Sequence, residues 1–259
     1  MKVYTYWENA PGRPMPPYVA LSIANMQRQL GGRFELLTAR SIAELGPLVL
    51  QKHWAFEALP FTQNPALLAI VAKSDYVRLA WIALYGGIWL DADMIVMASL
   101  DDLLARVASS GKLHWSSEAF FAAAPGHAIL REASKAALAS PRQAWGNPGG
   151  VRDLIAARPN DICVLDPSLL DPGYVPQYGF PTCDIMHSTR QSVEEFLTNP
   201  DLRVLKLYNT YFSRSALNSS PEAFLSSGTL LARLFLAIKS DPRYWLEAAQ
   251  AVMSQVQGA

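Results

Sequence analysis

Two carboxylates one residue apart, Asp91 and Asp93, are the residues of this chain whose types and spacing most clearly suggest chemistry. They follow the apolar run 88–90, which is typical of a short strand buried on both faces. Residues two apart in an extended strand point to the same side, so both side chains can reach one cation. We also expect the Asp93 side chain to be exposed to solvent at the end of the strand. Oxygen ligands suit Mg²⁺ or Mn²⁺. Because ligands bind beyond the carboxyl ends of strands in open α/β sheets, the pair indicates a site for a metal-bound diphosphate, with a surface acidic turn as the alternative.

Three further side chains are candidates for binding a ligand near this pair. Asp75 and Arg78 are three residues apart in a stretch with helical apolar spacing, so they share one helix face. They can contact a polyhydroxylated ligand, or form an ordinary local ion pair worth about 0.3–0.5 kcal/mol. Trp7 ends the first apolar run, where it either packs at the rim of the core or serves as an aromatic platform for a base ring.

Strands and helices alternate along most of the chain, and this order determines where the candidate residues lie. The pattern predicts strands at 3–7, 34–37, 88–90, 112–115, 119–123, 162–165 and 204–208. It predicts helices at 17–30, 64–85, 100–107, 128–139, 151–157, 221–240 and 241–256, and a short one from Ser41. We therefore expect an α/β fold with a mixed, mainly parallel sheet flanked by helices. We expect one domain over residues 1–259, with C-terminal helices at 221–259 packed on it.

Composition limits the classes of function. The 259 residues are 51% hydrophobic and 17% charged, which is enough apolar material for a sizeable core. A formal net charge of zero offers no overall basic field for nucleic acid. Cys163 and Cys183 form no CxxC pair, which argues against a disulfide framework or a structural zinc site.

Targeting signals give the expected location. No apolar run approaches the roughly 20 residues that span a bilayer, and the N-terminus lacks the apolar core of a signal peptide, so we expect a cytoplasmic protein. For the two terminal helices, packing on the sheet is favoured over docking at the inner face of a membrane, and both interpretations stay open.

The segment from Ser74 to Asp93 resembles the DxD region of the family 32 glycosyltransferases. These include bacterial capsular-polysaccharide sugar transferases and, more distantly, the large clostridial glucosylating toxins. The family pattern is S-D-x-x-R, an apolar stretch, and G-G-x-(aromatic or apolar)-x-D-x-D. This chain has S-D-Y-V-R, L-A-W-I-A-L-Y and G-G-I-W-L-D-A-D. The likeness extends to the opening strand that ends in Trp7, and to residues 119–129, which resemble the family's F-x-A-x-P-x-H-P stretch.

The resemblance implies a GT-A type fold and a metal-dependent hexose transfer, with retention, from a UDP- or GDP-sugar to a hydroxyl acceptor in bacterial glycan synthesis. It implies that Trp7 stacks on the nucleobase and that Asp75 and Arg78 hold the hydroxyls of the transferred sugar. Asp91 would contact ribose, sugar or metal, and Asp93 would ligate Mn²⁺ or Mg²⁺ directly. Asp91, Asp93 and Arg78 are the catalytic candidates.

The chain departs from the family pattern at two places. Glu118 stands nearest to the polar residue that relatives carry before the F-x-A-x-P stretch, and we group it with the donor-binding residues. A late His-x-Trp motif is replaced by residues 204–213. Within them, Asn209 and Ser213 are candidate metal ligands, and Lys206 is a candidate phosphate contact.

Two other functions remain alternatives at this stage. One is a metal-dependent phosphohydrolase that uses the same aspartate pair, although Met94 follows the pair where such enzymes often have Thr. The other is a nucleotide-sugar-binding or glycan-binding relative without turnover, because the late motif is altered.

Overall fold

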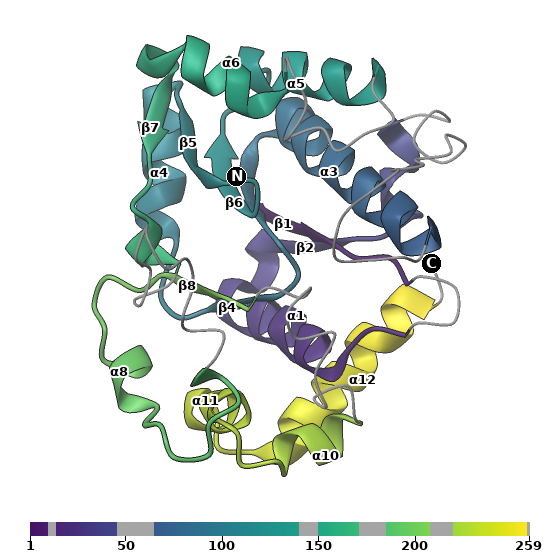
Figure 1. Cartoon of the computed structure of the whole chain (residues 1–259), viewed down its shortest axis with the longest axis vertical. Helices are drawn as coiled ribbons and strands as arrows, with labels where there is room; N and C mark the ends of the chain where they lie inside the picture. The colour runs from purple at the N-terminus through teal and green to yellow at the C-terminus, as the bar shows by residue number, and fades with distance from the viewer. Residues whose placement is uncertain (10–13, 46–64, 140–149, 171–184, 208–219, 258–259) are drawn as a thin grey trace.

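A computed structural model describes residues 1–9, 14–45, 65–139, 150–170, 185–207 and 220–257 of the chain. At its centre is a six-stranded sheet with the order β2-β1-β3-β6-β5-β7 (Figure 1). Its strands are β1 (Val3–Tyr6), β2 (Phe34–Leu37), β3 (Gly87–Leu90), β5 (Leu113–Ser117), β6 (Phe120–Ala123) and β7 (Ile162–Val164). β1 pairs in parallel with β2 and β3, and β5 with β7, whereas β6 runs antiparallel to β3 and β5. The predicted mixed, mainly parallel sheet is confirmed.

Helices cover both faces of this sheet. Those described are α1 (Pro17–Leu30), α3 (Pro65–Tyr85), α4 (Asp101–Ser110), α5 (Ala128–Ala139), α6 (Val151–Ala157), α8 (Glu194–Leu197), α10 (Pro221–Leu225), α11 (Leu230–Ile238) and α12 (Pro242–Gln257). Short 3-10 turns lie at Gly31–Arg33, Ser41–Leu45, Pro159–Asp161 and Pro167–Leu169. Within the described residues, each helix is too short or too polar to cross a lipid bilayer.

Strand β3 is buried on both faces, as its apolar sequence predicts. Trp89 packs with α3 and α5 in one hydrophobic cluster, whereas Ile88 and Leu90 pack with α4 in another. This alternation follows from the two-residue period of a strand. It fixes β3 firmly in the middle of the sheet, so the residues that follow it have a well-defined position.

The double glycine before β3 is needed for close packing. Gly86 ends α3 with a φ of 65°, and a Cβ there would lie 2.5 Å from the Pro125 ring. Gly87 has a φ of 112°, and a Cβ would lie 2.3 Å from the Lys2 carbonyl oxygen. Glycine therefore lets α3 end and β3 begin directly against β1.

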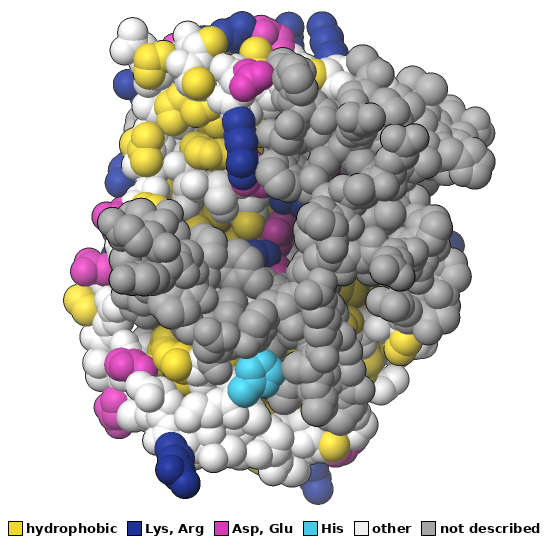
Figure 2. Space-filling model, in the orientation of Figure 1, with side chains coloured by type: hydrophobic (Ala, Val, Ile, Leu, Met, Phe, Trp, Pro, Cys, Tyr) yellow, Lys and Arg dark blue, Asp and Glu magenta, His cyan; other side chains and the backbone are white. Residues whose placement is uncertain are grey.

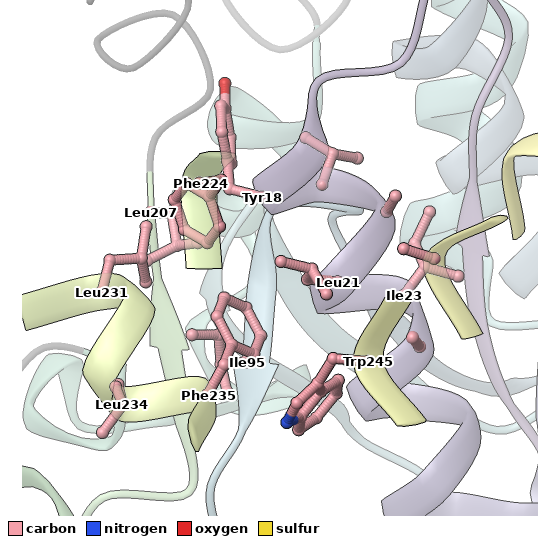
Figure 3. Packing of buried hydrophobic residues seen from close by; sticks show 14 of the residues in the cluster. Tyr18, Leu21, Ile23, Ile95, Leu207, Phe224, Leu231, Leu234, Phe235 and Trp245 are labelled. Carbon is pink, nitrogen blue, oxygen red and sulfur yellow. The ribbon is translucent and has the colours of Figure 1, made fainter. Parts of the chain in front are cut away.

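The structure differs from the sequence-based expectation at residues 221–240, at residues 94–96 and at Glu194–Leu197, where the short helix α8 was not predicted. The helix predicted at 221–240 is two helices, α10 and α11, because Gly228 between them has a φ of 67°. Residues Met94–Val96 form strand β4, which was not predicted, and it pairs antiparallel with β8 (Val204–Lys206) in a separate two-stranded sheet. Helices α10 and α12 pack against α1, and α11 packs against α10. Figure 3 shows Trp245 of α12 and Phe235 of α11 in the apolar cluster that these helices share.

Candidate functional site

Trp7 and Asp91 lie at the same edge of the sheet. β1 and β3 are neighbouring parallel strands, with Val3 opposite Ile88 and Tyr4 opposite Trp89. Trp7 directly follows β1 and Asp91 directly follows β3, so the two residues emerge side by side at the carboxyl ends of their strands. This is the edge where open α/β sheets bind ligands.

The two aspartates are brought together by a turn. β3 ends at Leu90, and the chain turns through Ala92 and Asp93 before β4 begins at Met94. The prediction of two carboxylates on one side of an extended strand was therefore wrong in its geometry, although the carboxylates do converge. Asp93 is also buried, with 4% exposure, and not exposed as expected.

Lys206 joins the two carboxylates. Its strand β8 pairs with β4 so that Lys206 lies opposite Met94. The Lys206 Nζ donates to Asp91 Oδ2 at 2.9 Å and makes a close contact with Asp93 Oδ1. One ammonium nitrogen thus bridges both acids, so their oxygens converge on a single cationic position.

Arg78 connects helix α3 to the same cluster. Its guanidinium lies 2.7 Å from Asp75 Oδ1 and 3.4 Å from Asp91 Oδ1, and donates to the Glu118 carbonyl oxygen at 2.8 Å. It also lies over the Trp89 ring, 6.0 Å from the ring centroid. The predicted local ion pair of Asp75 and Arg78 exists, and Arg78 additionally reaches the aspartate pair.

These contacts control the charge states of the site. Burial raises the pKa of Asp91, but the positive charges of Arg78 and Lys206 outweigh it and lower that pKa to about 2. Burial lowers the pKa of Lys206, and the charges of Asp91 and Asp93 overcome this and raise it. Asp91 is therefore ionised and Lys206 protonated at neutral pH. Trp89 also stabilises the Asp91 carboxylate by donating from its indole nitrogen at 3.0 Å.

The surroundings of Trp7 are partly polar. The indole nitrogen donates to Asn9 Oδ1 at 2.9 Å, and the half-buried ring packs against the cluster formed by α1 and the C-terminal helices. Glu8 accepts a close hydrogen bond from Tyr6 and forms an ion pair with Lys73 of α3. Rim packing of Trp7 is thus observed, and stacking on a base stays a prediction.

The remaining predicted residues have different outcomes. Glu118 reaches the cluster through its carbonyl oxygen, while its carboxylate accepts from Arg152 Nε at 2.6 Å. Asn209 and Ser213 lie outside the described residues.

Sequence reasoning did not single out Trp89 or Arg152. The tryptophan two residues before Asp91 was a usable signal, because side chains two apart share a side, whereas nothing in the sequence pointed to Arg152.

The oxygen atoms of Asp91 and Asp93 could provide part of the coordination shell of a hard divalent cation. Asp91 and Asp93 supply oxygen atoms that already surround one positive charge, and oxygen is what Mg²⁺ and Mn²⁺ prefer. Among the described residues, no three or more His, Cys, Asp or Glu side chains are placed so that they could hold a metal ion together. In Figure 2, acidic and basic side chains lie next to each other near the centre of the face.

Comparison with known proteins adds a family match. Residues 26–109 match the family model described as "Glycosyltransferase sugar-binding region containing DXD motif". The matched region includes Asp75, Arg78, Asp91 and Asp93, and no curated protein matches the chain. The narrower assignment to family 32 stays a prediction.

Two solved structures show similarity over nearly the whole chain. The apo-form glycosyltransferase GlyE of Streptococcus pneumoniae TIGR4 has a TM-score of 0.48 and 10% identity, covering 98% of this chain and 62% of that one. A second GlyE structure from the same organism has a TM-score of 0.46 and 11% identity, covering 97% and 64%. This chain therefore spans less than two thirds of the length of either structure.

Proposed function

We propose that this chain, which carries the DXD-containing sugar-binding region of glycosyltransferases, transfers a hexose from a UDP- or GDP-sugar to a hydroxyl acceptor. The proposal includes retention at the sugar carbon and a role in bacterial polysaccharide or glycan synthesis. One observation carries it. The two acids of the DXD motif converge on one ammonium group at the carboxyl end of β3, and Trp7 follows the neighbouring parallel strand β1.

Each residue has a role that its position supports. Asp93 and Asp91 would hold Mn²⁺ or Mg²⁺, which when bound acts as a Lewis acid for the departing diphosphate. Trp7 would offer its ring to the nucleobase. Asp75 and Arg78 would orient the sugar, and Arg78 in addition fixes Asp91 through the ion pair described above.

The charged groups of the cluster are held in place by contacts with one another, which supports a catalytic role. Arg78 links α3, the residue after β3 and the backbone at Glu118, so three segments of the chain share one guanidinium. Charged groups held in this way need no rearrangement when charge develops on a leaving group, and preorganised electrostatics of this kind is usually the largest contribution to catalysis.

Further expectations belong to the same proposal. We expect the chain to act as one domain over residues 1–259 in the cytoplasm, with a glycan or other hydroxyl compound as acceptor and without nucleic acid as partner. The apolar packing of α12 on α1 supports an internal role for the C-terminal helices over docking on a membrane.

The first experiment is a turnover assay with a panel of nucleotide-sugars in the presence of Mn²⁺. We expect release of free sugar or transfer to an added acceptor, with a nucleoside diphosphate as the other product. Asp93→Ala should lower this turnover by about 10²–10³-fold or more, because it removes charge stabilisation at the diphosphate. Asp201→Ala is the matched control, since Asp201 is exposed and lies outside the cluster.

The same assay separates the alternatives. Cleavage of simple phosphate esters without sugar transfer would favour the phosphohydrolase. Binding of a nucleotide-sugar without any product would favour a non-catalytic relative. Full activity of Asp93→Ala would overturn the assignment of the motif.

A further inference from the structure

Lys206 lies where a bound cation would be expected. Its side chain is buried, with 7% exposure, and its ammonium contacts one oxygen of each DXD carboxylate. The backbone around it is fixed, because the Lys206 N–H donates to the Leu170 carbonyl at 3.1 Å and the Leu207 N–H to the Asp93 carbonyl at 2.9 Å. The backbone of Lys206 is therefore held in place, and a change in the distance between its ammonium and the acids has to come from its side chain.

The charges of the cluster are nearly balanced. Asp75, Asp91 and Asp93 contribute three negative charges, and Arg78 and Lys206 contribute two positive ones. Summed over these five side chains alone, the net charge is −1 with the Lys206 ammonium and would be −2 without it. A divalent cation is therefore attracted less strongly while the Lys206 ammonium stays on the pair.

Geometry makes it unfavourable for the Lys206 ammonium and a divalent cation to bind the two carboxylates at the same time. An Mg²⁺ ion lies about 2.0–2.1 Å from each ligand oxygen. Lys206 already contacts one oxygen of each acid, Asp91 Oδ2 and Asp93 Oδ1, and Arg78 and Trp89 contact the other oxygen of Asp91. An ion on these oxygens would lie against the ammonium, with three positive charges in a largely buried space.

We propose that Lys206 is a resident counter-cation of the Asp91–Asp93 pair, and that its ammonium and a divalent cation occupy these two carboxylates in turn. Lys206 thereby weakens the affinity for the metal and keeps the two acids converged while no metal is bound. The inference rests on the proposed function only in taking this pair as the cation site.

The test measures binding of Mn²⁺ alone, by calorimetry or by electron paramagnetic resonance, to the full chain. Lys206→Met should tighten Mn²⁺ binding by at least about tenfold, because it removes a competing positive charge from the ligand oxygens. Lys206→Arg keeps the charge and should bind Mn²⁺ as weakly as the wild type. Lys135→Met is the matched control, since it removes an exposed lysine of α5 and should leave Mn²⁺ affinity unchanged.

A measurement on the wild type keeps the inference testable if Lys206→Met does not fold. Amine-reactive labelling, read by mass spectrometry, should find Lys206 protected without metal and more reactive at saturating Mn²⁺. Equal or weaker Mn²⁺ binding by a folded Lys206→Met, or unchanged labelling of Lys206, would overturn the inference. Absence of sugar transfer would instead count against the proposed function, because neither readout uses a sugar donor.

Discussion

Two buried regions of this molecule are built from opposite kinds of side chains. At the carboxyl end of β3, the buried residues are Asp75, Arg78, Asp93 and Lys206, held by ion pairs and hydrogen bonds. Between α1 and the C-terminal helices lies a large cluster of buried apolar side chains, in which Trp245 and Phe235 pack edge to face with ring centroids 5.3 Å apart (Figure 3).

The difference supports the proposed assignment of function to the ionic region. An apolar cluster stabilises the fold in proportion to the surface it removes from water, about 25 cal/mol per Å². A buried ionic cluster contributes little net stability compared with apolar residues of the same volume, because desolvation offsets the attraction. Stability alone therefore explains poorly why five charged side chains are held in contact near the end of β3, which supports the proposed role of this cluster. Substitutions in the two regions can test the contrast.

The largest effect is expected at Arg78. Arg78→Met leaves Asp75 and Asp91 without a shared cation, which should lower the free energy of unfolding by about 3–5 kcal/mol and also abolish donor turnover. Urea denaturation and the turnover assay measure the two effects. Arg158→Met is the matched control. Its pair with Glu132 lies near the surface, so a loss of no more than about 1 kcal/mol is expected. Equal stability losses in both variants would contradict the buried ionic cluster.

A similar loss of stability without a specific loss of function is expected at Trp245. Trp245→Ala should lower the free energy of unfolding by about 3–5 kcal/mol, because it opens a cavity in the apolar cluster and removes the hydrogen bond to the Lys239 carbonyl. Thermal and urea denaturation measure the loss, and Trp245→Phe should lose less. Mn²⁺ affinity of the folded protein should stay that of the wild type. A changed affinity would show that the two regions are coupled.

The smallest effect is a pH dependence at Asp91. The pKa of this carboxyl is about 2 in the folded chain against an ordinary value of 3.8, so its contribution is fully present above pH 4 and is lost as the pH falls towards 2. The contribution amounts to about 2 kcal/mol. Asp91→Asn should therefore be less stable than the wild type at pH 7, and the two should converge near pH 2.

Urea denaturation at a series of pH values provides the measurement for Asp91. Asp201→Asn serves as the control, because this exposed carboxyl should give the same stability curve as the wild type at every pH. A constant difference between Asp91→Asn and the wild type from pH 7 to pH 2 would mean that the charges of Arg78 and Lys206 do not stabilise the Asp91 carboxylate.

Much of the fold follows from local signals in the sequence. The bounds of α1, β2, α5 and α6 agree with the prediction at both ends, and α3 ends before Gly86 as expected. Glycine stops, proline starts and apolar spacing act within a few residues, so they can be recognised without tertiary structure. β4 was missed because a three-residue strand is defined by its partner β8 and has no local signature of its own.

The sequence by itself determined that Asp91 and Asp93 follow a buried strand, and that Asp75 and Arg78 share a helix face that leads into it. Only the tertiary structure decided what neutralises the two acids. Lys206 is 115 residues away from Asp91 along the chain, and the pairing of β4 with β8 brings its ammonium between the carboxylates. The spacing of residues is a local property of the chain. The charge that pairs with a buried acid depends on which distant segment packs against that acid.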